Sequence, residues 1–165
     1  AEINWPALFT LIKRGKVAFS GQSNGGVVAQ ANACNGEIML VPVTRNRDGR
    51  EMFLLLQSVP FGGGRTNVGI YYKELANVSD FRSPEAVAKN WTGRHQSSTK
   101  GSAYSTMCWQ KDHTVAFLYE EDTHGTNGGG YTIVYKNYTI EQITDGAYSY
   151  KAGINEDAFS SSRTK

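Results

Sequence analysis

The chain has 165 residues, 39% of them hydrophobic and 12% aromatic, which is enough apolar material for one globular domain with its own core. Its 17 Lys and Arg residues against 15 Asp and Glu residues give a formal net charge of +2. No run of basic residues could neutralise a row of phosphates, so nucleic acid is not an expected partner. No stretch reaches the roughly 20 apolar residues of a membrane-spanning helix, so no membrane span is expected.

Short apolar and aromatic runs, separated by turn residues, recur along the chain, which is the pattern of antiparallel β-sheet. The runs that predict strands are residues 16–20, 36–43, 50–57, 66–73, 103–110, 114–121 and 130–138. The turn sequences at residues 46–49, 110–113 and 122–130 each join two of these strands into a hairpin. The sequence therefore predicts an all-β fold.

Two short helical segments are predicted among the strands. Residues 83–85 supply an N-cap serine, a proline at the first helical position and an acidic residue before a helix at residues 86–90. A second helical turn is predicted over residues 139–144, and the Asp-Gly pair at 145–146 ends it. The polar residues 155–165 are expected to form a loose tail.

Consecutive hairpins fit a sandwich, a barrel or a propeller, and the pattern alone does not separate these architectures. A propeller blade takes about 40–50 residues, so this chain would hold roughly three or four blades, too few to close the commoner rings. An unclosed sheet leaves its edges exposed. The chain begins at Ala1 without an initiator methionine or a signal-peptide pattern, so we expect it to be part of a longer polypeptide.

Cysteine and histidine residues give no sign of a metal site. Cys34 and Cys108 allow one disulfide at most, and both lie in apolar runs where a buried free thiol is expected. His95, His113 and His124 lack the spacing of metal ligands and are expected in solvated loops. We therefore expect no metal and no cofactor.

The first candidate site residue is Tyr104, which lies among small residues in Gly101-Ser-Ala-Tyr-Ser105 at the start of a predicted strand. These neighbours leave its hydroxyl uncrowded. The ordinary interpretation of one tyrosine among nine is a core ring with its hydroxyl satisfied at the surface. A phenol, with an ordinary pKa of about 10, becomes a useful nucleophile only where a carboxylate takes its proton.

Two further candidates are Arg65 and Glu120. Arg65 follows three glycines in the segment 60–67, and its guanidinium can bind a carboxylate through a rigid two-pronged fork. Considered alone, it would be a solvated hairpin arginine. Glu120 closes the apolar segment 117–121, where an acidic residue is usually solvated.

Together these segments resemble the bacterial exo-α-sialidases, a family of glycoside hydrolases. The matching motifs, in the family's order, are Gly64-Arg-Thr-Asn67, Ser102-Ala-Tyr-Ser105 and Leu118-Tyr-Glu120. The segment 130–143 is similar to the family's last strand and terminal helix, and the segment 34–40 is similar to an earlier strand. The combination is more specific than any one motif.

The resemblance implies a partial six-bladed β-propeller of antiparallel four-stranded blades, with residues 1–150 as its C-terminal part and residues 151–165 as a polar tail. Arg65 would belong to an arginine triad that holds the carboxylate of sialic acid. Tyr104 would be the nucleophile of a retaining reaction. Glu120 would support another triad arginine, outside this chain. Sialylated glycans and the N-terminal remainder of the enzyme would be the partners, in a secreted, periplasmic or cell-surface bacterial protein.

The chain also departs from the family. It has no Asp-box repeat, and the early arginine, the aspartate acid/base and the glutamate that activates the tyrosine have no counterparts in it. We therefore expect these 165 residues to be inactive by themselves. Two alternatives remain: a non-catalytic glycan-binding module, in which Arg65 and nearby aromatic residues hold a sugar acid, and a trans-sialidase that uses the same residues.

Overall fold

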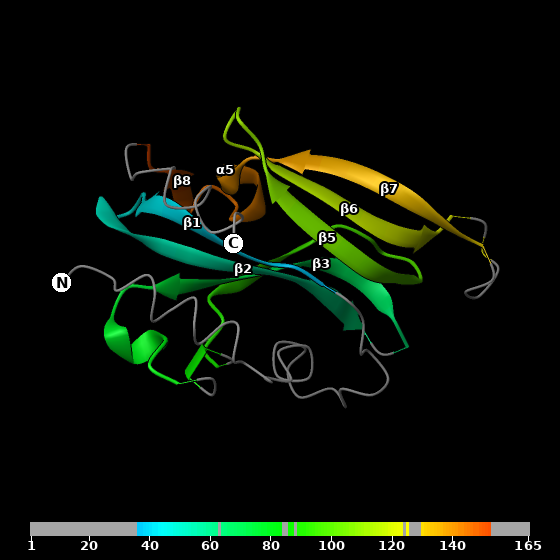
Figure 1. The fold of residues 1–165 in the computed structure, drawn as a ribbon, viewed down its shortest axis with the longest axis horizontal. Helices are drawn as coiled ribbons and strands as arrows, with labels where there is room; N and C mark the ends of the chain where they lie inside the picture. The colour runs from blue at the N-terminus through cyan, green and yellow to red at the C-terminus, as the bar shows by residue number, and fades with distance from the viewer. Residues whose placement is uncertain are drawn as a thin grey trace, which may run out of the picture.

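The structure is a computed structural model that describes residues 36–152, apart from residues 63, 84, 85, 88, 124 and 126–129. Most of the regular structure in this part is β-strand (Figure 1). None of its helices has the length and apolar character needed to cross a membrane. The elements in chain order are β1 (Ile38–Arg45), β2 (Arg50–Gly62), β3 (Thr66–Leu75), the 3-10 helix η1 (Val78–Asp80), β4 (Gly93–Gln96), β5 (Ser102–Trp109), β6 (Val115–Asp122), β7 (Tyr131–Tyr138), α5 (Ile140–Ile143) and β8 (Tyr148–Tyr150).

These strands form two sheets. The larger has five strands in the order β4-β3-β2-β1-β8, and the smaller has three in the order β5-β6-β7. Every pair of neighbouring strands is antiparallel. The β-structure curls like half of a barrel, with the smaller sheet lying over the larger (Figure 1). The predicted antiparallel all-β fold is confirmed for the described residues.

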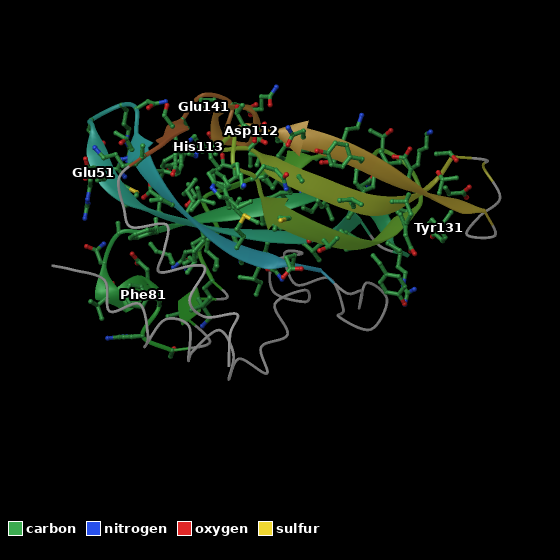
Figure 2. The ribbon with its side chains drawn as sticks, turned by 45° about the horizontal axis from the view of Figure 1, so that its top comes forward. Glu51, Phe81, Asp112, His113, Tyr131 and Glu141 are labelled. Atoms are coloured by element: carbon green, nitrogen blue, oxygen red, sulfur yellow. The ribbon has the colours of Figure 1, made fainter. Side chains whose placement is uncertain are left out.

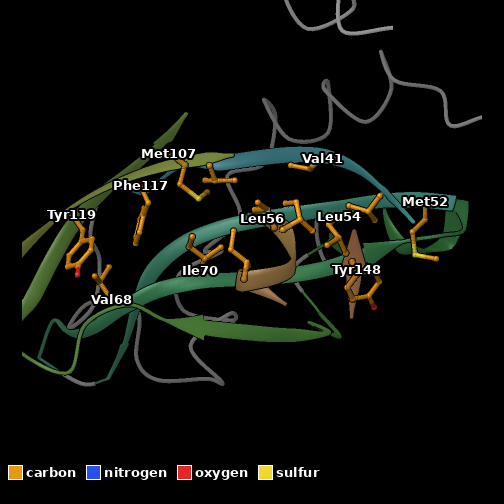
Figure 3. Close-up of a cluster of buried hydrophobic side chains, with 14 residues drawn as sticks. Val41, Met52, Leu54, Leu56, Val68, Ile70, Met107, Phe117, Tyr119 and Tyr148 are labelled. Atoms are coloured by element: carbon orange, nitrogen blue, oxygen red, sulfur yellow. The ribbon is translucent and has the colours of Figure 1, made fainter. Parts of the chain in front are cut away.

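The main hydrophobic core lies between the two sheets. Alternate residues of β2 and β6 point into it, because successive side chains along a strand point to opposite faces. Leu54, Leu56 and Phe117 are completely buried, and Figure 3 shows Met107 and Phe117 of the smaller sheet facing Ile70 of β3. Full burial of such a side chain contributes roughly 1.5–3 kcal/mol. This packing fixes the position of β5 relative to β2 and β3, on which the candidate site depends.

Strand β2 is longer than the predicted strand at residues 50–57 and continues through Pro60 to Gly62. Pro60 has no N–H to donate, so it is tolerated only where one side of a strand does not need to pair. The β1 ladder ends at Gln57, and Pro60 keeps its register with Val68 of β3. Pro60 therefore lies in the part of β2 that is beyond the β1 ladder.

Two strands were not predicted. β4 has the polar sequence Gly-Arg-His-Gln and lies at the edge of the larger sheet, so it lacks an apolar alternation. β8 has only three residues and pairs with the end of β1. His95 therefore lies on a strand rather than in the predicted loop.

The predicted helical turn at residues 139–144 is present as α5. The Thr139 hydroxyl accepts a hydrogen bond from the Gln142 N–H, and the Thr139 N–H donates to the Gln142 side chain, forming a capping box. Asp145 and Gly146 then adopt positive φ angles of 51° and 78°, which end the helix. Near the other predicted helix, the Ser83 hydroxyl accepts from the Ala86 N–H, as an N-cap does.

The expectation of a buried thiol at Cys108 was also wrong. Cys108 is exposed rather than buried, because β5 alternates and residue 108 falls on its solvent side. The predictions for residues 16–20 and 155–165, for Cys34 and for His124 lie outside the described residues. The division of the chain after residue 150 stays a prediction.

Candidate functional site

The hairpin between β2 and β3 presents Arg65 at one end of the molecule. Arg65 and Asn67 have positive φ angles of 61° and 60°, a conformation that is uncommon for residues other than glycine. Gly62 allows this turn because a Cβ on it would lie 2.2 Å from the Thr66 hydroxyl and 2.8 Å from the Asn67 side-chain nitrogen. Strained backbone of this kind persists only where surrounding contacts hold it, and it is concentrated at functional sites.

Tyr104 lies in a β-bulge at the start of β5. Ser102 pairs with Glu121 and Ser105 pairs with Tyr119, so Ala103 and Tyr104 both lie opposite the single residue Glu120 of β6. Ala103 is buried, whereas Tyr104 is 42% exposed. The bulge therefore directs the phenol out of the sheet, to a position where a ligand can reach it.

The structure brings Arg65 and Tyr104 together. The guanidinium carbon of Arg65 lies over the Tyr104 ring, 5.4 Å from its centroid, which is within the range of a cation–π contact. Two backbone hydrogen bonds join the two segments and form an antiparallel β-bridge between Thr66 and Gly101: the Ser102 N–H donates to the Arg65 carbonyl (2.8 Å), and the Asn67 N–H donates to the Lys100 carbonyl (3.0 Å). Two residues predicted separately from sequence thus share one site, across two sheets.

Glu120 lies beside the bulge, on the face of the smaller sheet that points away from the core. We call this the outer face, and strand alternation places on it the residues Tyr104, Leu118, Glu120, Tyr131, Ile133 and Tyr135. Glu120 is half-buried and is the register partner of Ile133 on β7. The third predicted residue therefore shares this face with Tyr104, at the position opposite the bulge.

Strand β7 exposes three large apolar side chains on the outer face. Tyr131, Ile133 and Tyr135 are 36%, 65% and 57% exposed. Figure 2 shows Tyr131 and His113 toward opposite ends of the smaller sheet. Tyr131 marks the end that holds the candidate site, because its hydroxyl lies 4.0 Å from the place of a Cβ on Gly101. The site thus opens onto a tyrosine-rich sheet face.

The sequence matches no protein-family model, and no curated protein gives a significant match to it. The support for a function therefore comes from the residues of the site.

A tyrosine–carboxylate pair, Tyr148 and Glu74, lies at the opposite end of β2. The Tyr148 hydroxyl donates a short hydrogen bond to Glu74, whose carboxylate also accepts two hydrogen bonds from Arg45, at 2.9 and 3.1 Å. Burial, followed by this hydrogen bond, raises the pKa of Tyr148 above its usual value. Asp48 pairs with the same guanidinium. Arg45 is thus paired with two carboxylates, and a shallow hollow lined by Arg45 and Tyr148 lies beside this cluster.

Sequence reasoning missed two buried residues of the candidate site, Ser102 and Ser105. It interpreted the small residues around Tyr104 as leaving space for its hydroxyl. In the structure both serine hydroxyls form hydrogen bonds beneath the bulge. The signal was present as a serine on each side of the Ala-Tyr pair, but the partners lie on other strands and cannot be identified from the local sequence.

Proposed function

We propose that this chain is the C-terminal part of an exo-α-sialidase, in which Tyr104 is the nucleophile and Arg65 binds the carboxylate of sialic acid. The observation that carries the proposal is the position of the Arg65 guanidinium over the Tyr104 ring. A carboxylate held by that guanidinium would lie beside the phenol. In sialic acid the anomeric carbon bears the carboxylate directly, so the same binding mode brings the reacting carbon to the tyrosine.

A tyrosine suits this substrate for an electrostatic reason. An anionic Asp or Glu nucleophile would be repelled by the carboxylate on the anomeric carbon, whereas a neutral phenol is not. The Tyr104 oxygen would form a bond to the anomeric carbon as the bond to the leaving glycosidic oxygen breaks, and water would then cleave the tyrosyl–sugar bond with net retention. We assign the group that takes the phenol proton, and the acid that protonates the leaving oxygen, to the remainder of the polypeptide.

Glu120 would act indirectly in this scheme. A half-buried carboxylate on an apolar sheet face needs a cationic or hydrogen-bonding partner. An arginine of the preceding chain would satisfy it, and Glu120 would then orient that guanidinium toward the same substrate carboxylate. Glu120 is therefore a positioning residue in this proposal.

The finer fold proposed is a partial six-bladed propeller. Within the five-stranded sheet, β4-β3-β2-β1 is an antiparallel series of the size of one blade, to which the short strand β8 is added at the β1 edge. The β5-β6-β7 sheet would become a second blade with one added strand. Among the described residues β7 pairs only with β6 and carries the exposed Tyr131, Ile133 and Tyr135. A further blade from the N-terminal remainder would cover this apolar face. The sialylated glycans of a secreted, periplasmic or cell-surface enzyme would be its substrates.

A glycan-binding module is the second candidate. It is favoured by the exposed ring of Tyr104 in contact with Arg65 and by the exposed ring of Tyr131 near Gly101, since rings of this kind stack on sugars without any reaction. A trans-sialidase would use the same residues as the hydrolase. The two enzymes differ only in whether water or a second sugar accepts the sialyl group.

The proposal is tested with an aryl α-sialoside and the complete protein that contains this chain. We expect release of sialic acid as the α-anomer first, as detected by proton NMR, and no release by the isolated 165 residues. The methyl ester of the same sialoside is the matched control, because it removes the carboxylate charge and should react poorly. Binding of the sialoside without release would favour the module, and transfer of the sialyl group to added lactose would favour the transferase.

A further inference from the structure

We propose that Ser102 is a positioning residue, whose buried hydroxyl fixes the Arg65 turn relative to Tyr104. The Ser102 side chain is completely buried. Its hydroxyl accepts a hydrogen bond from the Val68 N–H (2.8 Å) and donates one to the Lys100 carbonyl (3.1 Å). Its catalytic consequence rests on the proposed function, whereas its structural consequence does not.

The three hydrogen bonds of Ser102 surround the strained turn. Its N–H donates to the carbonyl of Arg65, just before β3, and its hydroxyl accepts from the N–H of Val68, three residues later. Arg65, whose carbonyl accepts the first of these bonds, and Asn67, which lies between the two bonded groups, both have positive φ angles. A non-glycine residue holds that conformation only where its surroundings over-determine it. The Ser102 hydroxyl supplies one of the fixed ends of the turn.

Ser105 forms a second hydrogen bond to the larger sheet, on the other side of the bulge. Its hydroxyl donates to the Ser58 hydroxyl on β2 at 2.9 Å, and Ser58 in turn accepts from the Glu37 N–H. The bulge gives β5 an extra residue at Tyr104, which would otherwise leave the phenol loosely placed. Hydroxyls at positions 102 and 105 hold the two ends of this bulge against the larger sheet.

A hydroxyl is needed at position 102 for its bonding and not for its volume. Alanine would fit the same space and preserve the backbone pairing with Arg65. It would leave the Val68 N–H buried without its acceptor, which costs free energy. The turn would therefore shift so that this N–H can bond to another acceptor. The expected consequence of Ser102→Ala is a displaced Arg65 side chain, in a protein that keeps the same sheets.

The experiment compares Ser102→Ala with Thr144→Val in the full chain labelled with 13C-arginine. Thr144 is a matched control, since its buried hydroxyl also bonds to backbone groups, the Ile140 carbonyl and the Tyr148 N–H, at the other end of the molecule. Protons over an aromatic ring are shielded, so the Arg65 methylene signals should lie upfield and return downfield in Tyr104→Leu. We expect Ser102→Ala to shift the same signals downfield and Thr144→Val to leave them in place.

Kinetics of the complete enzyme give the second measurement. We expect Ser102→Ala to lower kcat/KM about 10- to 100-fold, mostly through KM, because a misplaced guanidinium weakens carboxylate binding. Thr144→Val should leave both constants within about twofold of the wild type. Ser105→Ala, which keeps the Ser58 bond to Glu37, is the milder variant if Ser102→Ala does not fold, and it should also move the Arg65 signals.

The outcomes separate this inference from the proposed function. Arg65 signals that do not respond to Ser102→Ala, or to Ser105→Ala where that variant is used, would overturn the positioning role. Arg65 signals that respond equally to Thr144→Val would also overturn it, since general loosening would explain the result. A protein that shows the expected shifts but releases no sialic acid would contradict the sialidase proposal and leave the role of Ser102 intact.

Discussion

The guanidinium carbon of Arg65 lies 5.4 Å from the centre of the Tyr104 ring, although the two residues belong to segments of different sheets. Backbone hydrogen bonds between residues 65–67 and 100–102 hold the segments together. The contact places a cation and an exposed phenol at one site.

Replacing Tyr104 with phenylalanine should abolish turnover without unfolding the protein. Loss of a nucleophile typically lowers kcat by at least about 10³-fold, while removal of an exposed hydroxyl changes the free energy of unfolding by no more than about 0.5 kcal/mol. Tyr150→Phe is the matched control. Tyr150 lies on β8 and stacks on His113, at the end of the molecule away from Tyr104. Equal activity of Tyr104→Phe and the wild type would remove Tyr104 from the mechanism.

Replacing Arg65 with lysine should raise KM although the positive charge is retained. Lysine lacks the two-pronged geometry of the guanidinium, and loss of a hydrogen bond to a charged group costs about 1.5–3 kcal/mol, or about 10- to 150-fold in binding. The measurement is the KM of the complete enzyme for an aryl sialoside. Arg47→Lys, at the opposite end of β2, should leave KM unchanged. A KM that is the same in Arg65→Lys and the wild type would contradict the assigned role.

Ile133 distinguishes an incomplete fold from a complete one. Phe117→Ala should destabilise both the isolated chain and the complete protein by about 3–5 kcal/mol, since Phe117 is fully buried in the core. Ile133→Ala should change the isolated chain by no more than about 0.5 kcal/mol, because Ile133 is 65% exposed there. In the complete protein Ile133→Ala should lower the free energy of unfolding by more than this, because a further blade would cover the outer face. Urea denaturation of the isolated chain and of the complete protein measures these free energies. An equally small effect of Ile133→Ala in the two proteins would argue against a covering blade.

The raised pKa of Tyr119 predicts that the free energy of unfolding falls at alkaline pH. Burial, with smaller effects of Glu121 and Tyr138, raises the pKa of Tyr119 to about 12, and its hydroxyl donates to the Ser97 carbonyl at 3.2 Å. Between pH 10 and pH 12 the folded form therefore keeps a proton that the unfolded chain has lost. The stability from this group is complete below pH 10 and disappears as the pH rises through 12. Tyr119→Phe should show a shallower fall in unfolding free energy across this window, and an identical fall would contradict the shift.

Local sequence was sufficient for most strands but not for their partners. Turn residues and alternating apolar positions located the six strands predicted within the described region, and the Asp-Gly pair at 145–146 indicated the end of α5. The polar edge strand β4 and the three-residue β8 carry no such pattern. Both exist because a neighbouring strand offers hydrogen bonds, which is a property of the tertiary structure.

The candidate site was predictable in part. Arg65, Tyr104 and Glu120 could be selected as residues, through their motifs and their resemblance to sialidases. The bulge that exposes Tyr104 depends on the register of β5 against β6, which the sequence of β5 alone does not determine. The hydrogen bonds of Ser102 and Ser105 likewise require β2 and β3 to be in place.

Covalent trapping tests the central claim most directly. The complete protein is treated with a fluorinated sialic acid donor, which slows breakdown of the glycosyl intermediate, and the adduct is located by peptide mass spectrometry. We predict one modification, on the peptide that contains Tyr104, and none in Tyr104→Phe. An adduct on any other residue, or a turning-over enzyme that forms none, would contradict Tyr104 as the nucleophile.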